Sequence, residues 1–326
     1  MRKSSAFDLS QERIVLFLAL TLLLIFSVTI DGFLQSDNIL SIIQSVSVLG
    51  ILGIAMAISI IGRGIDLSVV AIMVYAVAWT LALAGTGMSL YLALLLGLGF
   101  AICAGLVNGF LIAYAEIPAI FATLASGTAI YGFGQYFLVS TEVIYLPADF
   151  GGLEVIGSGR TFGIPNIVFS FAVMALAVWL LLQKTVFGRY LYAMGDNPAA
   201  ARSTGIPTRP LMVAQYVLSA VIGYIAGLVT ATAVASMNTR IVNSTLIYDV
   251  ILVAVIGGIS LSGGRGNIRN VLVGTVLIGI LLNGMTMLNM PYTAQNIIKG
   301  AVLLIAIIAD SYFNPRDEQT SQQGDI

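Results

Sequence analysis

Charged residues are scarce in this sequence, and their scarcity excludes a soluble globular domain. Asp, Glu, Lys and Arg make up only 9% of the 326 residues, whereas 59% are hydrophobic and the mean hydropathy is +1.01. Soluble domains carry roughly 25% charged residues. Apolar runs of about 18 residues or more recur along the chain, and this pattern predicts an integral membrane protein. A net charge of −1 also argues against nucleic acid as a partner.

Histidine is absent, and Cys103 is the single cysteine. These absences remove the commonest metal ligand, the commonest general base and any disulfide within the chain. The sequence also lacks a catalytic constellation and a G-x-x-x-x-G-K-[ST] phosphate loop. Asp249 lies in an apolar run without an evident partner. We therefore expect neither an enzyme nor a metal site, and no ATP bound through a Walker site of the chain's own.

Ten apolar segments are long enough to be transmembrane helices, and they predict an all-α fold in one transmembrane domain over residues 1–326. The predicted spans are residues 14–30, 39–61, 65–84, 89–114, 118–138, 165–183, 210–235, 246–262, 270–290 and 294–312. Lys and Arg favour the cytoplasmic side of short loops. With the N-terminus inside, only three of the 14 Lys and Arg residues lie outside, namely Arg160, Arg240 and Lys299. Both termini are therefore predicted to be cytoplasmic.

Five spans in each half would give the two halves opposite orientations, as in inverted membrane repeats. The fourth span of each half contains an Asn-Gly pair, Asn108-Gly109 and Asn283-Gly284, which favours such a repeat without requiring it. The longest external segment is then 139–164, and the main cytoplasmic segment is 184–209.

The cytoplasmic segment carries the signals of a short helix over residues 198–204. Asn197 is a suitable N-cap, and Pro198 suits the first helical position. Three alanines follow, Arg202 lies in the last turn, and Gly205 can adopt the left-handed conformation that closes a helix. The residues alone leave two interpretations open: a helix that merely joins two spans, or a surface that fits into another protein.

Two glycine-rich segments lie at the ends of predicted spans. In the first, Gly62 and Gly64 allow the backbone to bend, and Arg63 is near enough to neutralise Asp66. Asp66 is interpreted either as a helix N-cap or as a contact for a solute within the membrane. The second segment allows a tight turn or a close helix approach through two glycine pairs, Gly257-Gly258 and Gly263-Gly264.

At these motifs the chain resembles the permease subunits of the monosaccharide class of bacterial ABC importers, a group that includes ribose, xylose and arabinose permeases. The family's GGIDLSVG is similar to GRGIDLSVVA at residues 62–71, and residues 108–126 resemble a further family pattern. Arg63 and Val70 stand where the family commonly has glycine. A second motif matches at Gly188, Ala193, Gly195, Asn197, Ala200, Ala201, Gly205 and Ile206. A third matches at Gly257, Gly258, Ser260, Leu261, Gly263, Gly264 and Gly266.

The resemblance implies a permease of the bacterial inner membrane that imports a monosaccharide or related polyol and needs no cofactor of its own. It implies three partners: an ABC ATPase, an external sugar-binding protein near loop 139–164, and a second permease copy. The residues expected to dock on the ATPase are Gly195, Asn197, Pro198, Ala200, Ala201, Arg202 and Gly205. Those expected along the substrate pathway are Asp66, Asn108, Thr123, Gln135, Asn283 and Gln295. The alternatives are a permease for nucleosides or branched-chain amino acids, an ion-coupled transporter, or a membrane protein without transport.

Overall fold

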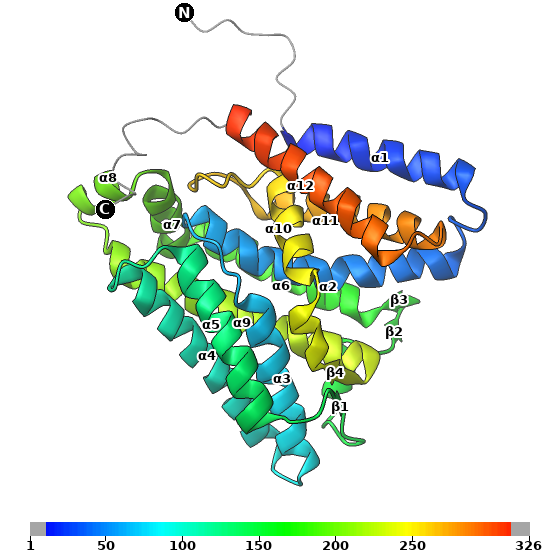
Figure 1. Cartoon of the computed structure of the whole chain (residues 1–326), viewed down its shortest axis with the longest axis horizontal. Coiled ribbons are helices and arrows are strands. Elements are labelled where there is room, and N and C mark those ends of the chain that lie inside the picture. The colour runs from blue at the N-terminus through cyan, green and yellow to red at the C-terminus, as the bar shows by residue number, and fades with distance from the viewer. Residues whose placement is uncertain (1–10, 314–326) are drawn as a thin grey trace, which may run out of the picture.

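The computed structural model describes residues 11–313, and in this range the protein is a bundle of α-helices (Figure 1). The helices of the first half are α1 (Gln11–Thr29), α2 (Ser36–Ile61), α3 (Val69–Gly85), α4 (Leu90–Ala113) and α5 (Ala119–Phe133), which a π-helical turn continues over Gly134–Leu138. Those of the second half are α6 (Asn166–Lys184), α7 (Val186–Asp196), α8 (Pro198–Ser203), α9 (Thr208–Val234), α10 (Leu246–Gly257), α11 (Ile268–Met287) and α12 (Tyr292–Phe313).

Length and composition allow six of the described helices to cross a membrane: α1, α2, α4, α6, α9 and α11. The shorter helices α3 and α10 are also apolar, as is the Tyr292–Ile308 part of α12. Each predicted span overlaps one helix among α1–α6 and α9–α12, so the structure confirms an all-α membrane protein. The predicted span 246–262 is too long, because Gly258 adopts φ +106° and α10 ends at Gly257.

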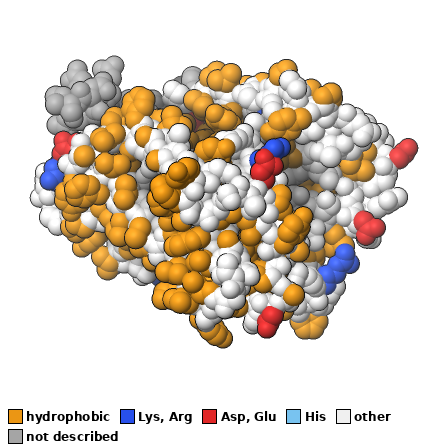
Figure 2. All heavy atoms as spheres, turned by 60° about the horizontal axis from the view of Figure 1, so that its bottom comes forward, with side chains coloured by type: hydrophobic (Ala, Val, Ile, Leu, Met, Phe, Trp, Pro, Cys, Tyr) orange, Lys and Arg blue, Asp and Glu red, His pale blue; other side chains and the backbone are white. Residues whose placement is uncertain are grey.

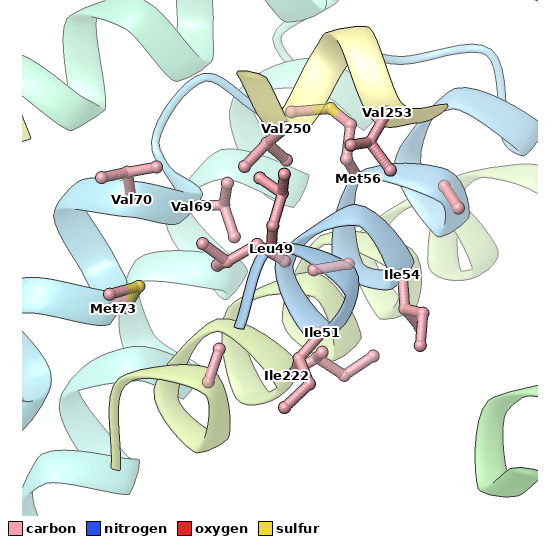
Figure 3. Close-up of a cluster of buried hydrophobic side chains, with 14 of the residues drawn as sticks. Leu49, Ile51, Ile54, Met56, Val69, Val70, Met73, Ile222, Val250 and Val253 are labelled. Atoms are coloured by element: carbon pink, nitrogen blue, oxygen red, sulfur yellow. The ribbon is translucent and has the colours of Figure 1, made fainter. Parts of the chain in front are cut away.

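The core lies where α2 and α3 meet α9 and α10 (Figure 3). Both α2 and α3 are apolar on nearly all sides, a pattern typical of a helix that other helices surround. The side chains that meet there are Leu49, Ile51, Ile54 and Met56 of α2, Val69, Val70 and Met73 of α3, Ile222 of α9, and Val250 and Val253 of α10.

Small residues on α4 allow it to approach α9 closely. A Cβ atom at Gly105 would lie 2.7 Å from the Cα atom of Val217, and one at Gly109 would lie 2.6 Å from that of Val213. The two glycines are four residues apart and share one face of α4, as small residues do in tightly packed membrane helices. Side chains at these positions would therefore push α4 and α9 apart.

The contacts of α3 and α10 match one another between the two halves. Helix α3 packs against α4, α5 and α9, and α10 packs against α11, α12 and α2. Figure 1 shows α8 at one end of the bundle and strands β1 (Val143–Tyr145) and β4 (Ser236–Asn238) towards the opposite end. We call these the α8 end and the strand end.

The strand end is covered by residues that follow α5 and α9. Strands β1 and β4 pair antiparallel, with Val143 opposite Asn238, and the 3-10 turn η3 (Thr239–Asn243) follows β4. A second small hairpin pairs β2 (Arg160–Thr161) with β3 (Ile164–Pro165), after the 3-10 turn η2 (Leu153–Ile156). The predicted loop 139–164 is thus ordered by short strands and turns.

Candidate functional site

The short helix predicted from the sequence is present as α8, with the predicted caps. The side-chain Oδ1 atom of Asn197 accepts a hydrogen bond from the Ala200 amide at 3.0 Å, and Pro198 occupies the first turn. Gly205 has φ +83°, and the Ile206 amide donates to the Ala201 carbonyl at 3.0 Å. Local capping chemistry therefore sets where this helix begins and ends.

Helix α8 exposes small side chains at the edge of the molecule (Figure 1). Ala201 is buried and fixes the helix to the bundle, whereas Ala199, Ala200 and Arg202 are exposed. The methyl groups leave the backbone accessible, and Arg202 adds one positive charge beside them.

Helix α7, which precedes α8, was not predicted from the sequence. Thr185 caps it by accepting from the Gly188 amide, and Leu191 and Met194 are buried on its inner face. The signal that identifies it is this threonine cap followed by apolar residues three residues apart. The Tyr192 hydroxyl donates to the Gly266 carbonyl at 2.8 Å, and burial raises the pKa of this hydroxyl, which keeps it a neutral donor.

Three glycine motifs that are distant in the sequence meet where α7 ends. A Cβ atom at Gly195 would lie 1.9 Å from the Ile61 carbonyl oxygen and 2.6 Å from the Gly264 nitrogen. The Gly264 amide donates to that same Ile61 carbonyl at 2.8 Å. We call this contact of α2, α7 and the α10–α11 loop the glycine junction, formed by Gly62, Gly195, Gly263 and Gly264. Gly64 lies beside it and faces α9, where a Cβ atom would meet the Tyr216 hydroxyl.

The glycine pair Gly257-Gly258 lies outside the glycine junction. Gly257 packs on α11, since a Cβ atom there would lie 2.1 Å from the Asn270 carbonyl oxygen, and Gly258 ends α10. The α10–α11 loop therefore leaves α10 through one glycine pair and reaches α7 through the other.

Asp66 is fully buried, and its partners are hydroxyl and amide groups rather than Arg63. Its Oδ1 atom accepts from the Ser68 amide and hydroxyl, at 3.0 and 2.6 Å, and its Oδ2 atom accepts from the Ser219 hydroxyl at 2.8 Å. Arg63 is exposed with φ +69°, a conformation that glycine adopts without cost. The predicted neutralisation of Asp66 by Arg63 was wrong, because the left-handed backbone turns the arginine outward.

Two adjoining cavities form a groove beside α3 that extends towards the strand end, and we call it the outer groove. One cavity, of about 370 Å³, is lined by Leu67, Val70, Ala71, Leu124, Gly127, Thr128, Tyr131, Val242, Asn243, Ser244, Thr245, Ile247 and Tyr248. The other, of about 420 Å³, is lined by Tyr131, Gln135, Glu142, Thr239, Arg240 and Asn243. Tyr131 and Asn243 belong to both, so the cavities adjoin. Both volumes lie in the range of small-molecule sites.

Charged side chains of the outer groove compensate one another. Arg240 donates to Glu142 at 2.5 Å, and these two are the only residues with ionised side chains among those that line the two cavities. The remaining polar groups are hydroxyls and amides, beside the tyrosine rings. Figure 2 likewise shows a face on which hydrophobic side chains are widespread and charged ones are few.

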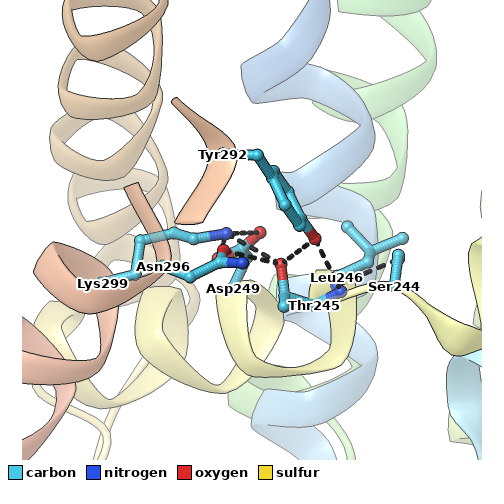
Figure 4. Close-up of polar contacts among 7 residues, drawn as sticks. All are labelled: Ser244, Thr245, Leu246, Asp249, Tyr292, Asn296 and Lys299. Carbon is cyan, nitrogen blue, oxygen red and sulfur yellow. Dashed lines mark hydrogen bonds and ion pairs between the residues drawn. The ribbon is translucent and has the colours of Figure 1, made fainter. Parts of the chain in front are cut away.

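A buried ion pair lies behind the groove wall (Figure 4). The Lys299 ammonium on α12 lies 2.9 Å from Oδ1 of Asp249 on α10, and both residues are less than one-tenth exposed. Lys299 also donates to the Thr245 hydroxyl at 2.9 Å, and the Tyr292 hydroxyl lies 2.9 Å from the same atom. Asp249 therefore pairs with Lys299, 50 residues away in the sequence, although no partner was evident from the sequence around it.

The six residues predicted for a substrate pathway lie in different places. Gln135 lines the outer groove, where its Oε1 atom accepts from Tyr75. Asp66, Asn108 and Thr123 are fully buried around residues 62–68. The last two lie on α11 and α12: Asn283 exchanges hydrogen bonds with Asn38, and Gln295 donates to the Met290 carbonyl.

Sequence reasoning missed the polar and aromatic lining of the groove between η3 and α10. Asn243, Thr245 and Tyr248 belong to this lining. Their signal is a cluster of polar residues directly before a short apolar segment, which is easily mistaken for an ordinary loop.

Comparisons with known proteins identify the family. A family model described as the permease component of branched-chain amino acid transport systems matches residues 38–307. The chain is 33% identical over 310 residues to the ribose import permease protein RbsC of Bacillus subtilis (strain 168), covering 95% of this chain and 96% of the relative. It is 36% identical over 248 residues to the galactofuranose transporter permease protein YtfT of Escherichia coli (strain K12), covering 76% and 72%.

A third relative is the L-arabinose transport system permease protein AraH of Escherichia coli (strain K12), which is 31% identical over 249 residues, 76% of this chain and 74% of the relative. No solved structure was found to match the chain. The chain belongs to this permease family and is a multi-pass transport subunit of the inner membrane, not an enzyme.

Proposed function

We propose that the chain is the permease of a binding-protein-dependent ABC importer that moves a monosaccharide or related polyol into the cytoplasm. The observation that carries this proposal is that relatives named for ribose, galactofuranose and arabinose match over 72% to 96% of their own lengths. The family description names amino acids, so the substrate class needs a second argument from the groove.

The chemistry of the outer groove favours an uncharged polyhydroxylated solute. An amino acid brings an ammonium and a carboxylate, and each needs an opposite charge once it leaves water. Glu142 and Arg240 already satisfy one another. Hydroxyl and amide groups, such as those of Asn243 and Thr245, can instead exchange hydrogen bonds with sugar hydroxyls. Because a binding protein supplies the affinity, this groove should bind its solute only weakly.

The architecture that supports this function is ten spans in two inverted halves, with both termini in the cytoplasm. The matching contacts of α3 and α10 support the repeat, and the distribution of Lys and Arg supports the orientation. This orientation places the α8 end in the cytoplasm and the outer groove on the external side. Loop 139–164, which contributes Glu142 to the groove, is then the surface that the external binding protein contacts.

Helix α8 is the contact for the ATPase in this proposal. Membership of the sugar-importer class implies an ATPase and a binding protein as partners. The residues that dock are Gly195, Asn197, Pro198, Ala200, Ala201, Arg202 and Gly205, of which Gly195 and Ala201 act from buried positions. Closure of the ATPase would move α8 and, through the glycine junction, the ends of α2 and α10. A second copy of the permease would close the open side of the outer groove.

Uptake by cells that express the complete importer tests the substrate class. We expect accumulation of a labelled pentose or hexose that other sugars reduce and that leucine and uridine leave unchanged. The Tyr248→Ala variant should take up less sugar, and Tyr91→Ala, which removes an exposed tyrosine from the start of α4, should behave as wild type. Reduction of uptake by leucine alone would contradict the sugar assignment.

The energy source separates this proposal from ion-coupled transport. Uptake should stop when ATP is depleted and continue when a protonophore collapses the ion gradient while ATP is maintained. The opposite result would favour an ion-coupled transporter.

A further inference from the structure

Residues 62–68, which follow α2 and precede α3, lie between the glycine junction and the outer groove. This Asp66 segment leaves the junction at Gly62, and its Leu67 side chain lines the groove. It is not helical between Gly64 and Asp66, so its backbone groups depend on partners outside their own helix. The segment therefore borders both sites at once.

Helix α9 contacts the Asp66 segment through three residues, Gln215, Tyr216 and Ser219. A Cβ atom at Gly62 would lie 1.7 Å from Oε1 of Gln215, and one at Gly64 would lie 2.1 Å from the Tyr216 hydroxyl. The Ser219 hydroxyl donates to Oδ2 of Asp66 at 2.8 Å. Helix α8 ends at Ser203 and α9 begins at Thr208, so a short loop joins α8 to the helix that makes these contacts.

Helices α5 and α4 hold the other side of the segment. The Thr123 hydroxyl accepts from the Leu67 amide at 3.1 Å, and its one hydrogen faces two carbonyl oxygens, that of Ile65 at 3.0 Å and that of Ala119 in its own helix at 2.8 Å. Asn108 donates to the Ser68 hydroxyl at 2.7 Å, which in turn donates to Asp66. Fully buried side chains of three helices thus fix a segment whose own backbone has few helical hydrogen bonds.

The carboxylate of Asp66 links the start of α3 to α9. Each oxygen of Asp66 accepts from a different element: Oδ1 from Ser68 at the start of α3, and Oδ2 from Ser219 on α9. An asparagine presents one accepting oxygen and one donating nitrogen at these two positions, so one of the two serine hydroxyls would have to turn from donor to acceptor. The wall residue Leu67 lies directly between Asp66 and Ser68, and its backbone position is set by this arrangement.

We propose that the Asp66 segment transmits displacement of α8 and the glycine junction to the wall of the outer groove, and that Asp66 and Ser219 are the positioning residues that join it to α9. The inference rests on the proposed function, because it assumes that an ATPase moves α8. It adds a mechanical link between the two sites. In this arrangement Asp66 acts on the substrate only through Leu67 and the groove wall.

The test is the amount of sugar transported per ATP hydrolysed by the complete importer in proteoliposomes, with its ATPase and a saturating binding protein. Ser219→Ala leaves the carboxylate and its Ser68 contacts in place and removes the hydrogen bond from α9 to Asp66, while Gln215 and Tyr216 still pack on Gly62 and Gly64. We expect ATP hydrolysis to continue while sugar transported per ATP falls by roughly two- to thirty-fold, the range of coupling changes seen for such residues. Asp66→Asn should lower the same ratio, and adding Ser219→Ala to it should lower the ratio little further.

Ser47→Ala is the matched control, because Ser47 is a buried serine on α2 whose hydroxyl bonds only its own helix, at the Ile43 carbonyl. It should leave the ratio unchanged. If Ser219→Ala transports as much sugar per ATP as wild type, the inference is overturned. It is also overturned if the variant loses hydrolysis and transport equally because the complex assembles poorly. Wild-type importer without ATP-driven sugar uptake would instead contradict the proposed function, and the inference with it.

Discussion

The buried ion pair between α10 and α12 allows a prediction with a magnitude. Replacing Lys299 by methionine keeps the length of the side chain and removes its charge. Asp249 is 8% exposed and would then be a buried carboxylate without a cation among its described neighbours. Removing one partner of a buried pair costs about 3–5 kcal/mol. We therefore expect Lys299→Met to lower the unfolding temperature in detergent by roughly 6–20 °C, at about 2–4 °C per kcal/mol.

Arg240→Gln is the matched control at the exposed pair with Glu142. Those side chains are 72% and 55% exposed, and such pairs contribute about 0–1 kcal/mol. The control should therefore change the unfolding temperature little. The double variant Lys299→Met with Asp249→Asn should recover much of the loss, because no unpaired charge remains. If Lys299→Met costs no more than Arg240→Gln, the ion pair is not buried as described.

Two further predictions concern α7 and α8. Gly195→Ala should disrupt the glycine junction and reduce recovery of folded protein, because a Cβ atom would lie 1.9 Å from the Ile61 carbonyl oxygen. Gly85→Ala is the control and should leave recovery unchanged, because a Cβ atom there meets nothing within 4 Å. Asn197→Ala should destabilise α8 by about 1 kcal/mol and reduce ATPase copurification several-fold, whereas Asn197→Ser should retain the cap and the complex. If Asn197→Ala copurifies as much ATPase as wild type, docking does not depend on a well-formed α8.

Local signals in the sequence predicted the elements better than their contacts. Helix α8 was predicted with its caps because Asn197, Pro198 and Gly205 act within a few residues of one another. The spans were predicted because a helix in lipid needs a long apolar run. The end of α10 was missed because Gly258 lies inside such a run, and hydropathy does not register backbone conformation.

Contacts between distant residues were not predictable from these patterns. No local pattern indicates that Lys299 lies beside Asp249. Nor does any local pattern indicate that Ser219 contacts Asp66, which is 153 residues away in the sequence. Each glycine motif was interpreted by itself, as a bend, a tight turn or a close helix approach, and Gly195 was assigned only to the docking segment. In the structure Gly195 and Gly264 need to be small because the backbones of their two segments touch. Pairings of this kind depend on the packing of the whole bundle.

Copurification of an ATPase with the detergent-extracted permease tests the central claim most directly. Wild type should bring down an ATPase, and a variant with residues 197–205 replaced by a Gly/Ser linker should be inserted equally well and bring down none. Absence of an ATPase from both preparations would contradict the importer assignment. An ATPase retained by the linker variant would contradict the docking role of α8.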